Sequence, residues 1–138
     1  MLYEKYLSVI DEKAEEIKGL ADYIWDNPEL CFKEEKAVAM LTKKLEENGF
    51  TVTRNLVGIP TAFKATFGSG SPRLGILAEY DAVEGFSQVG GIAEKKSIEG
   101  KTATHCCGHN LFAAGSFAAA LAVKAVCKTF YKHNKTTL

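Results

Sequence analysis

The stretch GHNLFAAGSFAAALAVKAVCKTF, residues 108–130, consists mainly of alanine, glycine and other small or apolar side chains. This composition predicts a long helix, because alanine has the highest helix propensity. Small side chains let a helix backbone come close to a neighbouring layer, and we expect that layer to be a sheet. The rest of the chain must supply it, since a helix buries its apolar face only against another element.

Two more helices are predicted near the N-terminus. Residues 3–25 have apolar residues every three or four positions, which is typical of a helix with one buried face. The pair Asn27-Pro28 ends this helix, because a residue before proline avoids helical geometry. A second helix is predicted over residues 33–48, and Gly49 fits the left-handed position that follows a helix.

Strands are predicted between these helices. Residues 50–57 and 61–67 are rich in β-branched and aromatic side chains and alternate in part. In residues 73–82, RLGILAEYDA, the continuous apolar run at 74–78 predicts a strand buried on both faces. Residues 83–104 predict a long loop of the kind that is often functional or mobile. The element order favours a mixed α/β layer.

The composition fits one ordinary globular domain over residues 1–138, with 46% apolar and 25% charged residues. Lys plus Arg and Asp plus Glu number 17 each, so we expect neither a nucleic-acid partner nor an anionic membrane. We expect no apolar run long enough to span a bilayer and, without the apolar core of a signal peptide, a cytoplasmic protein. Its four cysteines are then expected to be thiols.

Two clusters could carry chemistry. Glu79 and Asp81 leave the end of the predicted buried strand, where ligands bind in open α/β sheets. The segment HCCGH, residues 105–109, offers thiols and imidazoles, which are good zinc ligands. Whether this segment is extended or helical, Cys106 and Cys107 should point in different directions. A carboxylate of the first cluster could be an oxygen ligand or could fix the tautomer of a ligating histidine.

Other readings of these residues stay open at this point. A cysteine beside an alanine-rich helix is often a small core residue, and a strand-end carboxylate is often merely solvated. A cysteine nucleophile with a histidine partner is also compatible with the segment. A disulfide between neighbouring cysteines is disfavoured, because the ring that it closes is strained.

Three blocks of sequence together resemble a known family. NPELCFKEEKA (27–37), GILAEYDAVEGFSQ (75–88) and HCCGHNLFAAGS (105–116) occur in the order seen in metal-dependent amidohydrolases of the aminoacylase/carboxypeptidase metallopeptidase superfamily. The most similar branch is the aminobenzoyl-glutamate hydrolase type. The resemblance implies an α/β fold, specifically the mixed-sheet N-terminal part of a zinc-peptidase-like catalytic domain, with the lid domain absent.

The resemblance also implies roles for individual residues. Cys107 and His109 match metal ligands, for zinc or manganese. Asp81 matches the catalytic-site Asp that orients a ligand. Glu79 stands where dinuclear relatives have a ligating histidine, and it is assigned here to the residues that support the ligands. His105 matches a residue that supports the ligands from behind. The chain departs from the family pattern at three positions, where Cys31, Val83 and Cys106 replace residues usual in the family.

The expected function is the N-terminal part of an enzyme that cleaves a small amide substrate, an N-acyl amino acid or an aminobenzoyl-glutamate-type amide. Family members carry their general-base Glu and further His ligands downstream, whereas residues 110–138 contain no Asp or Glu. We therefore expect an N-terminal fragment that is inactive alone and binds metal weakly. Two alternatives are a non-catalytic subunit that complements a C-terminal half or associates with itself, and a thiol-reactive protein.

Overall fold

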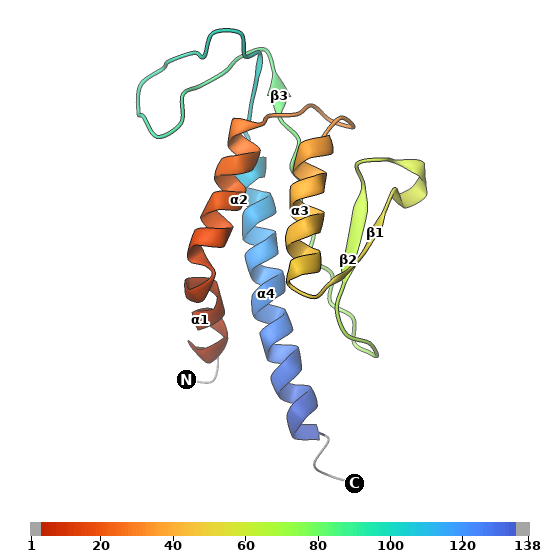
Figure 1. Ribbon diagram of the computed structural model, residues 1–138. Helices are drawn as coiled ribbons and strands as arrows, with labels where there is room; N and C mark the ends of the chain where they lie inside the picture. Colours follow the sequence, from red (N-terminus) through yellow and green to blue (C-terminus); the bar gives the residue numbers. More distant parts are fainter. Residues whose placement is uncertain (1–3, 135–138) are drawn as a thin grey trace.

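The structure is a computed structural model that describes the backbone of residues 4–134 and the side chains of residues 4 and 6–127 (Figure 1). The predicted start of the first helix at Tyr3 lies outside the described residues. The main elements, in chain order, are α1 (Glu4–Glu12), α2 (Ala14–Asp26), α3 (Glu35–Glu47), β1 (Thr51–Arg54), β2 (Phe63–Thr66), β3 (Val83–Glu84), β4 (Ala103–Thr104) and α4 (His109–Asn134). The helices thus form close to where the apolar periodicity predicts them.

Two of the predicted helix ends are confirmed, but the first predicted helix is not continuous. The single predicted helix is divided at Lys13, which has φ −102° and ψ 9°. The region ends as predicted at Asn27, whose backbone N–H and side-chain amide both donate to the Tyr23 carbonyl. Helix α3 ends at Glu47 and is followed, as predicted, by Gly49 in a left-handed conformation with φ +77°. The Gly49 N–H donates to Glu46, and the next N–H donates to Leu45, as in a Schellman motif.

The core lies where α4 packs against α1 and α2 and where α3 closes over one side (Figure 1). The expectation that α4 packs on a sheet is wrong, because its small residues bring it close to other helices. Burial of these side chains removes apolar surface from water and is the main stabilising contribution. The core residues are Leu20, Ala21, Ile24, Ala37, Leu41, Leu45, Ala113, Ala114, Phe117 and Leu121.

The strands do not form the single mixed sheet that was expected. Strands β1 and β2 form an antiparallel pair in which Thr51 faces Thr66, and β3 and β4 form a second antiparallel pair in which Val83 faces Thr104. Among the described residues, parallel pairing is limited to one bridge between Leu30 and Ala82. The fold is therefore a small mixed α/β arrangement with two separate sheets.

The segment 73–81 does not form the buried strand that its apolar run predicts. Leu74 is 73% exposed and Leu77 is 74% exposed. A strand that buries both faces needs a neighbour on each side, and the described residues supply none over this segment. The Leu77 carbonyl accepts a hydrogen bond from the Ser116 hydroxyl at 2.8 Å, so the segment lies along α4.

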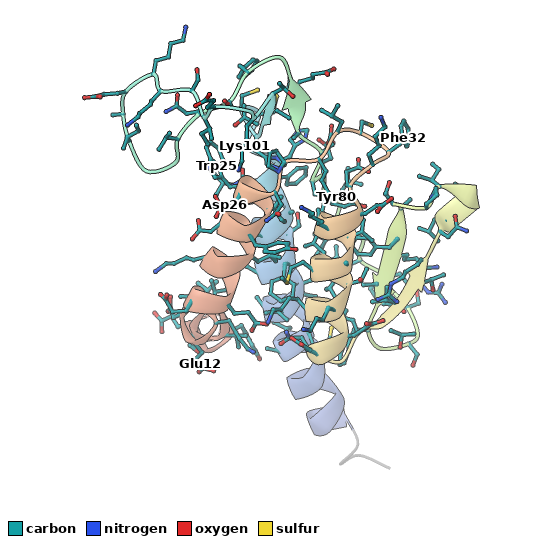
Figure 2. All side chains as sticks on the ribbon, turned by 45° about the horizontal axis from the view of Figure 1, so that its top comes forward. Glu12, Trp25, Asp26, Phe32, Tyr80 and Lys101 are labelled. Carbon is teal, nitrogen blue, oxygen red and sulfur yellow. The ribbon has the colours of Figure 1, made fainter. Side chains whose placement is uncertain are left out.

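The long loop predicted at 83–104 is present between β3 and β4, and it is internally hydrogen bonded. The Ser87 hydroxyl donates to the Ile98 carbonyl at 3.1 Å and accepts from the Ile98 N–H at 2.9 Å. Trp25 lies at the end of α2 next to this loop (Figure 2). A Cβ added to Gly90 would lie 2.9 Å from the indole nitrogen of Trp25, so glycine permits the close approach.

Helix α4 corrects the expectation about membrane-spanning length. Its portion His109–Cys127 is long and apolar enough to cross a bilayer by length and composition. Many core helices of globular proteins meet the same criterion, because alanine-rich helices are apolar all round. Here the helix contributes Ala113, Phe117 and Leu121 to the core of the molecule.

Candidate metal site

His109, the first residue of α4, lies between two carboxylates. Its Nδ1 is 2.8 Å from Asp81 Oδ1 and 3.1 Å from the Asp81 carbonyl oxygen, and its Nε2 is 3.1 Å from Glu79 Oε2. If Nδ1–H donates to Asp81, the neutral ring presents the Nε2 lone pair toward Glu79. The Nε2 lone pair and the Glu79 carboxylate are both hydrogen-bond acceptors, and they then face each other. A cation bound by both would remove this unfavourable contact.

The donor set fits a divalent metal. One ligand atom from each of Glu79, Asp81 and His109 lies within 4.8 Å of the others, and no other such group occurs among the residues that the structure describes. The 3.1 Å between Nε2 and Glu79 is close to the roughly 3.3 Å between two ligand atoms of a tetrahedral zinc site. The Glu79 side chain is 50% exposed, so the group is open to solvent.

Two backbone features place these side chains together. The Ala82 N–H donates to the Glu29 carbonyl at 2.7 Å, which holds the end of the 73–81 segment beside the turn after α2. Gly108, with φ +74°, turns the chain into α4, and its N–H donates to the His105 carbonyl at 2.9 Å. A side chain at that φ would be strained, so glycine is required for His109 to begin the helix here.

Cys107 is not part of the three-residue group. Its sulfur lies 3.9 Å from that of Cys106, and both residues are exposed. The expectation that the two thiols point apart is wrong, because residues 106–107 form a turn, neither extended nor helical. The contact with Cys106, followed by slight burial and the Asp81 charge, raises the pKa of Cys107, which disfavours a thiolate nucleophile at neutral pH.

His105 lies behind the site and is only 2% exposed. Neither of its ring nitrogens has a hydrogen-bond partner among the described residues. Burial lowers its pKa, against an opposing effect of the Ile24 carbonyl and the Asp81 charge, so the buried ring is held neutral. The structure thus places His105 inside the protein and near Asp81.

A hollow of about 210 Å³ adjoins the site and was not anticipated from the sequence. Tyr80 forms part of its wall and donates its hydroxyl proton to the Thr61 carbonyl. Burial, together with the charges of Glu34 and Asp81, raises the pKa of Tyr80 to about 12. The one available signal was Glu34 in the block NPELCFKEEKA, an acidic residue in the first turn of a predicted helix.

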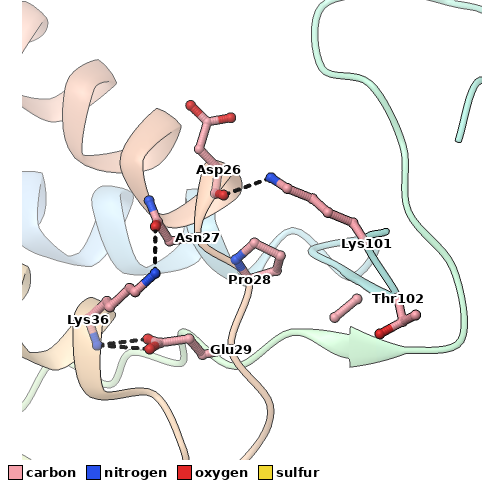
Figure 3. Close-up of a pocket in the computed structure, with 8 residues that line it drawn as sticks. Asp26, Asn27, Pro28, Glu29, Lys36, Lys101 and Thr102 are labelled. Atoms are coloured by element: carbon pink, nitrogen blue, oxygen red, sulfur yellow. Dashed lines mark hydrogen bonds between the residues drawn. The ribbon is translucent and has the colours of Figure 1, made fainter. Parts of the chain in front are cut away.

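A second hollow, of about 260 Å³, lies between the end of α2 and β4 (Figure 3). Three of its charged side chains, on Glu29, Lys36 and Lys101, have hydrogen-bond partners. The Glu29 carboxylate accepts from the Lys36 and Ala37 N–H groups at 2.9–3.0 Å and so caps the start of α3. The Lys101 ammonium donates to the Asp26 carbonyl at 2.9 Å. These contacts fix the turn between α2 and α3.

Comparisons with known proteins show what the chain is related to. No family model matches the chain. Its sequence is nevertheless homologous to the N-terminal part of curated amidohydrolases and dipeptidases, which confirms the resemblance found in the motifs.

Two curated relatives and one solved structure define this relation. The chain is 44% identical over 123 residues to one subunit of the p-aminobenzoyl-glutamate hydrolase of Escherichia coli (strain K12), covering 89% of this chain and 26% of the relative. It is 34% identical over 128 residues to Xaa-Arg dipeptidase of Homo sapiens, covering 83% of this chain and 26% of that protein. A crystal structure described as an aminohydrolase from methicillin resistant Staphylococcus aureus superposes with a TM-score of 0.71 at 22% identity, over 88% of this chain and 31% of that one.

The chain thus spans about a quarter of the length of the curated relatives that it matches. The structural match at 22% identity concerns the fold alone. The motifs at 79–81 and 105–109 lie in the part of the chain that forms the site described above.

Proposed function

We propose that this chain is the N-terminal part of a metal-dependent amidohydrolase and contributes His109, Asp81, Glu79 and Cys107 to its metal site. The observation that carries the proposal is the position of His109, whose two nitrogens each lie within 3.1 Å of a carboxylate oxygen. The names of the relatives support an N-acyl amino acid or an aminobenzoyl-glutamate-type amide as the substrate class.

When bound, zinc or manganese would polarise the amide carbonyl and lower the pKa of a water molecule. Asp81 accepts the Nδ1 proton of His109, which fixes the tautomer and leaves Nε2 as the ligand atom. His105 is buried on the protein side of the Asp81–His109 pair, so it keeps water away from that side. Cys107 would complete the set after a local rearrangement of the turn at 106–107.

The chain alone is expected to bind metal weakly and not to hydrolyse amides. Residues 110–138 contain no carboxylate that could act as a general base after the histidine motif. Zinc and manganese titrations by calorimetry, together with an assay on aminobenzoyl-glutamate, test this expectation. Efficient hydrolysis by the purified chain, abolished by a chelator, would overturn the view that it is inactive alone.

A complementing role is a second candidate, and the exposed segment 73–81 favours it. The segment carries exposed apolar side chains, and its described backbone lacks strand partners, so a strand from another chain could pair with it. Size-exclusion chromatography with and without a polypeptide that carries the rest of a relative's sequence tests this role. A chain that stays monomeric and does not bind such a partner would contradict the complementing role.

We also propose a cytoplasmic protein without nucleic-acid or membrane partners. The equal numbers of basic and acidic residues, 17 each, give the chain no net attraction to phosphate groups of nucleic acids or lipids. Fractionation of cells that express the chain, with detection in the supernatant after removal of membranes, is the matching measurement.

A further inference from the structure

We propose that the hollow beside His109 binds an organic cation, a guanidinium or alkylammonium group, through the Glu34 carboxylate. This inference goes beyond the proposed function, because it concerns a binding site for a small cation and not the amide that is cleaved. It stands on the hollow alone.

The lining of the hollow is acidic and partly aromatic. Three carboxylates, from Glu34, Glu79 and Asp81, contribute to its wall, and its described lining contains no Lys, Arg or His. Two aromatic residues, Phe32 and Tyr80, also line the hollow, together with five smaller or aliphatic residues: Cys31, Ile59, Thr61, Ala62 and Ala78. Both rings lie near the end of the molecule where α3 begins (Figure 2). Carboxylates and aromatic faces together are the groups that attract an organic cation.

Glu34 provides an independent indication of a missing partner. The residue is 6% exposed, and its Oε2 has no hydrogen-bond partner among the described residues. An unpaired carboxylate away from water is costly, because it loses hydration without gaining a hydrogen bond. A cation that enters the hollow would supply the missing donor and charge.

Neighbouring groups do not already satisfy Glu34. The nearby Lys36 directs its ammonium to Asn27 at 3.2 Å, on the side of the other hollow. Glu34 is also absent from the group whose ligand atoms lie within 4.8 Å of one another, so it is separate from the candidate metal site. The hollow therefore adjoins the candidate metal site, but through Glu34 it would bind an organic cation and not the metal.

Titration of the metal-free chain with agmatine, followed by NMR or calorimetry in the presence of a chelator, tests the proposal. Agmatine carries both a guanidinium and an ammonium group, butylurea is a neutral probe of similar shape, and glutarate is an anionic one. We expect saturable agmatine binding below about 10 mM and none of the other two probes at that concentration. Equal binding of butylurea, or no binding of agmatine, would overturn the proposal.

The variant E34Q removes the charge at nearly constant volume, and E35Q is its matched control because Glu35 is exposed at the next position. Agmatine affinity should fall about tenfold or more in E34Q and stay within about twofold in E35Q. Without ligand, E34Q should melt at the same temperature as the original chain or higher, because it loses an unpaired charge. Equal affinities of the two variants, or a lower melting temperature of E34Q, would contradict the proposal.

These measurements separate the two proposals. Agmatine binding without zinc binding would leave the hollow in place and contradict the metal site. Zinc binding without agmatine binding would contradict the cation hollow and leave the proposed function in place.

Discussion

At the residue scale, His109 shows how one side chain gains a function from two neighbours. Asp81 lies 28 positions earlier in the chain and Glu79 lies 30 earlier, yet both contact the imidazole. The histidine is also the first residue of α4, so its backbone is anchored by a long helix. Rigid placement of this kind lowers the entropy that a ligand site loses when a metal binds.

Replacing Asp81 by alanine should weaken zinc binding. The variant loses the carboxylate that accepts the His109 Nδ1 proton and that offers an oxygen atom to the metal. The affinity for zinc is therefore expected to fall about tenfold or more. Competition with a zinc-sensitive dye measures the change. The control E84A removes an exposed carboxylate three positions away and should bind like the original chain; an unchanged affinity in D81A would show that Asp81 has no role in the site.

At the element scale, the packing of α4 against α2 holds the site together. Ile24 of α2 is fully buried, and Ala21 of the same helix accepts a hydrogen bond from the buried Asn110 at 3.3 Å. The first turn of α4 is thereby attached to α2 directly beside His109. Loss of this packing would move the histidine relative to Asp81.

The substitution I24A should destabilise the fold by about 2–4 kcal/mol, because it leaves a cavity at a fully buried position. Urea unfolding followed by circular dichroism measures the free energy of unfolding. L111A is the control, since Leu111 is 65% exposed, and it should change stability by no more than about 0.5 kcal/mol. Similar losses in both variants would refute the proposed core.

Glu16 of α2 joins α2 to α3 and makes stability depend on pH. Slight burial raises its pKa, but Lys13 at 2.8 Å, Lys44 at 3.4 Å and the Asn48 amide outweigh this effect, so the folded pKa is lowered. The stabilisation is then complete above the unfolded pKa, near the ordinary glutamate value of 4.5, and is lost as the pH falls through the folded pKa.

The variant E16Q should therefore be less stable than the original chain at pH 7, by about 0.5–1 kcal/mol, and equally stable near pH 2. Urea unfolding at both pH values provides the comparison. E15Q is a suitable control, because the Glu15 side chain is 90% exposed. A difference between E16Q and the original chain that persists unchanged in acid would contradict this role.

At the scale of the whole molecule, the segment 73–81 is notable because it exposes several large apolar side chains. Leu74, Ile76 and Leu77 are all exposed, and they lie on one continuous segment. Apolar surface of this extent commonly marks an interface. The chain also spans about a quarter of its curated relatives.

The double variant L74K/L77K should reduce self-association. If the exposed segment pairs between copies, the original chain will show a concentration-dependent sedimentation coefficient, and two lysines will suppress it by charge repulsion. Analytical ultracentrifugation measures this behaviour. V57K is the control, because Val57 is 94% exposed but lies outside the segment; equal suppression in V57K would argue against a specific interface.

The sequence by itself determined most of the helical spans and several of their ends, and it indicated Glu79, Asp81 and His109 as candidate site residues. Local signals sufficed there: apolar periodicity marks a buried helical face, Gly49 marks a helix end, and the motifs contain Asp81 and His109. Only the tertiary structure decided how the strands pair, that α4 packs on helices, that the two thiols share one side, and that Glu34 is buried beside the site. These features depend on contacts between residues far apart in the chain, and a strand such as 73–81 is buried only when a neighbour is present to cover it.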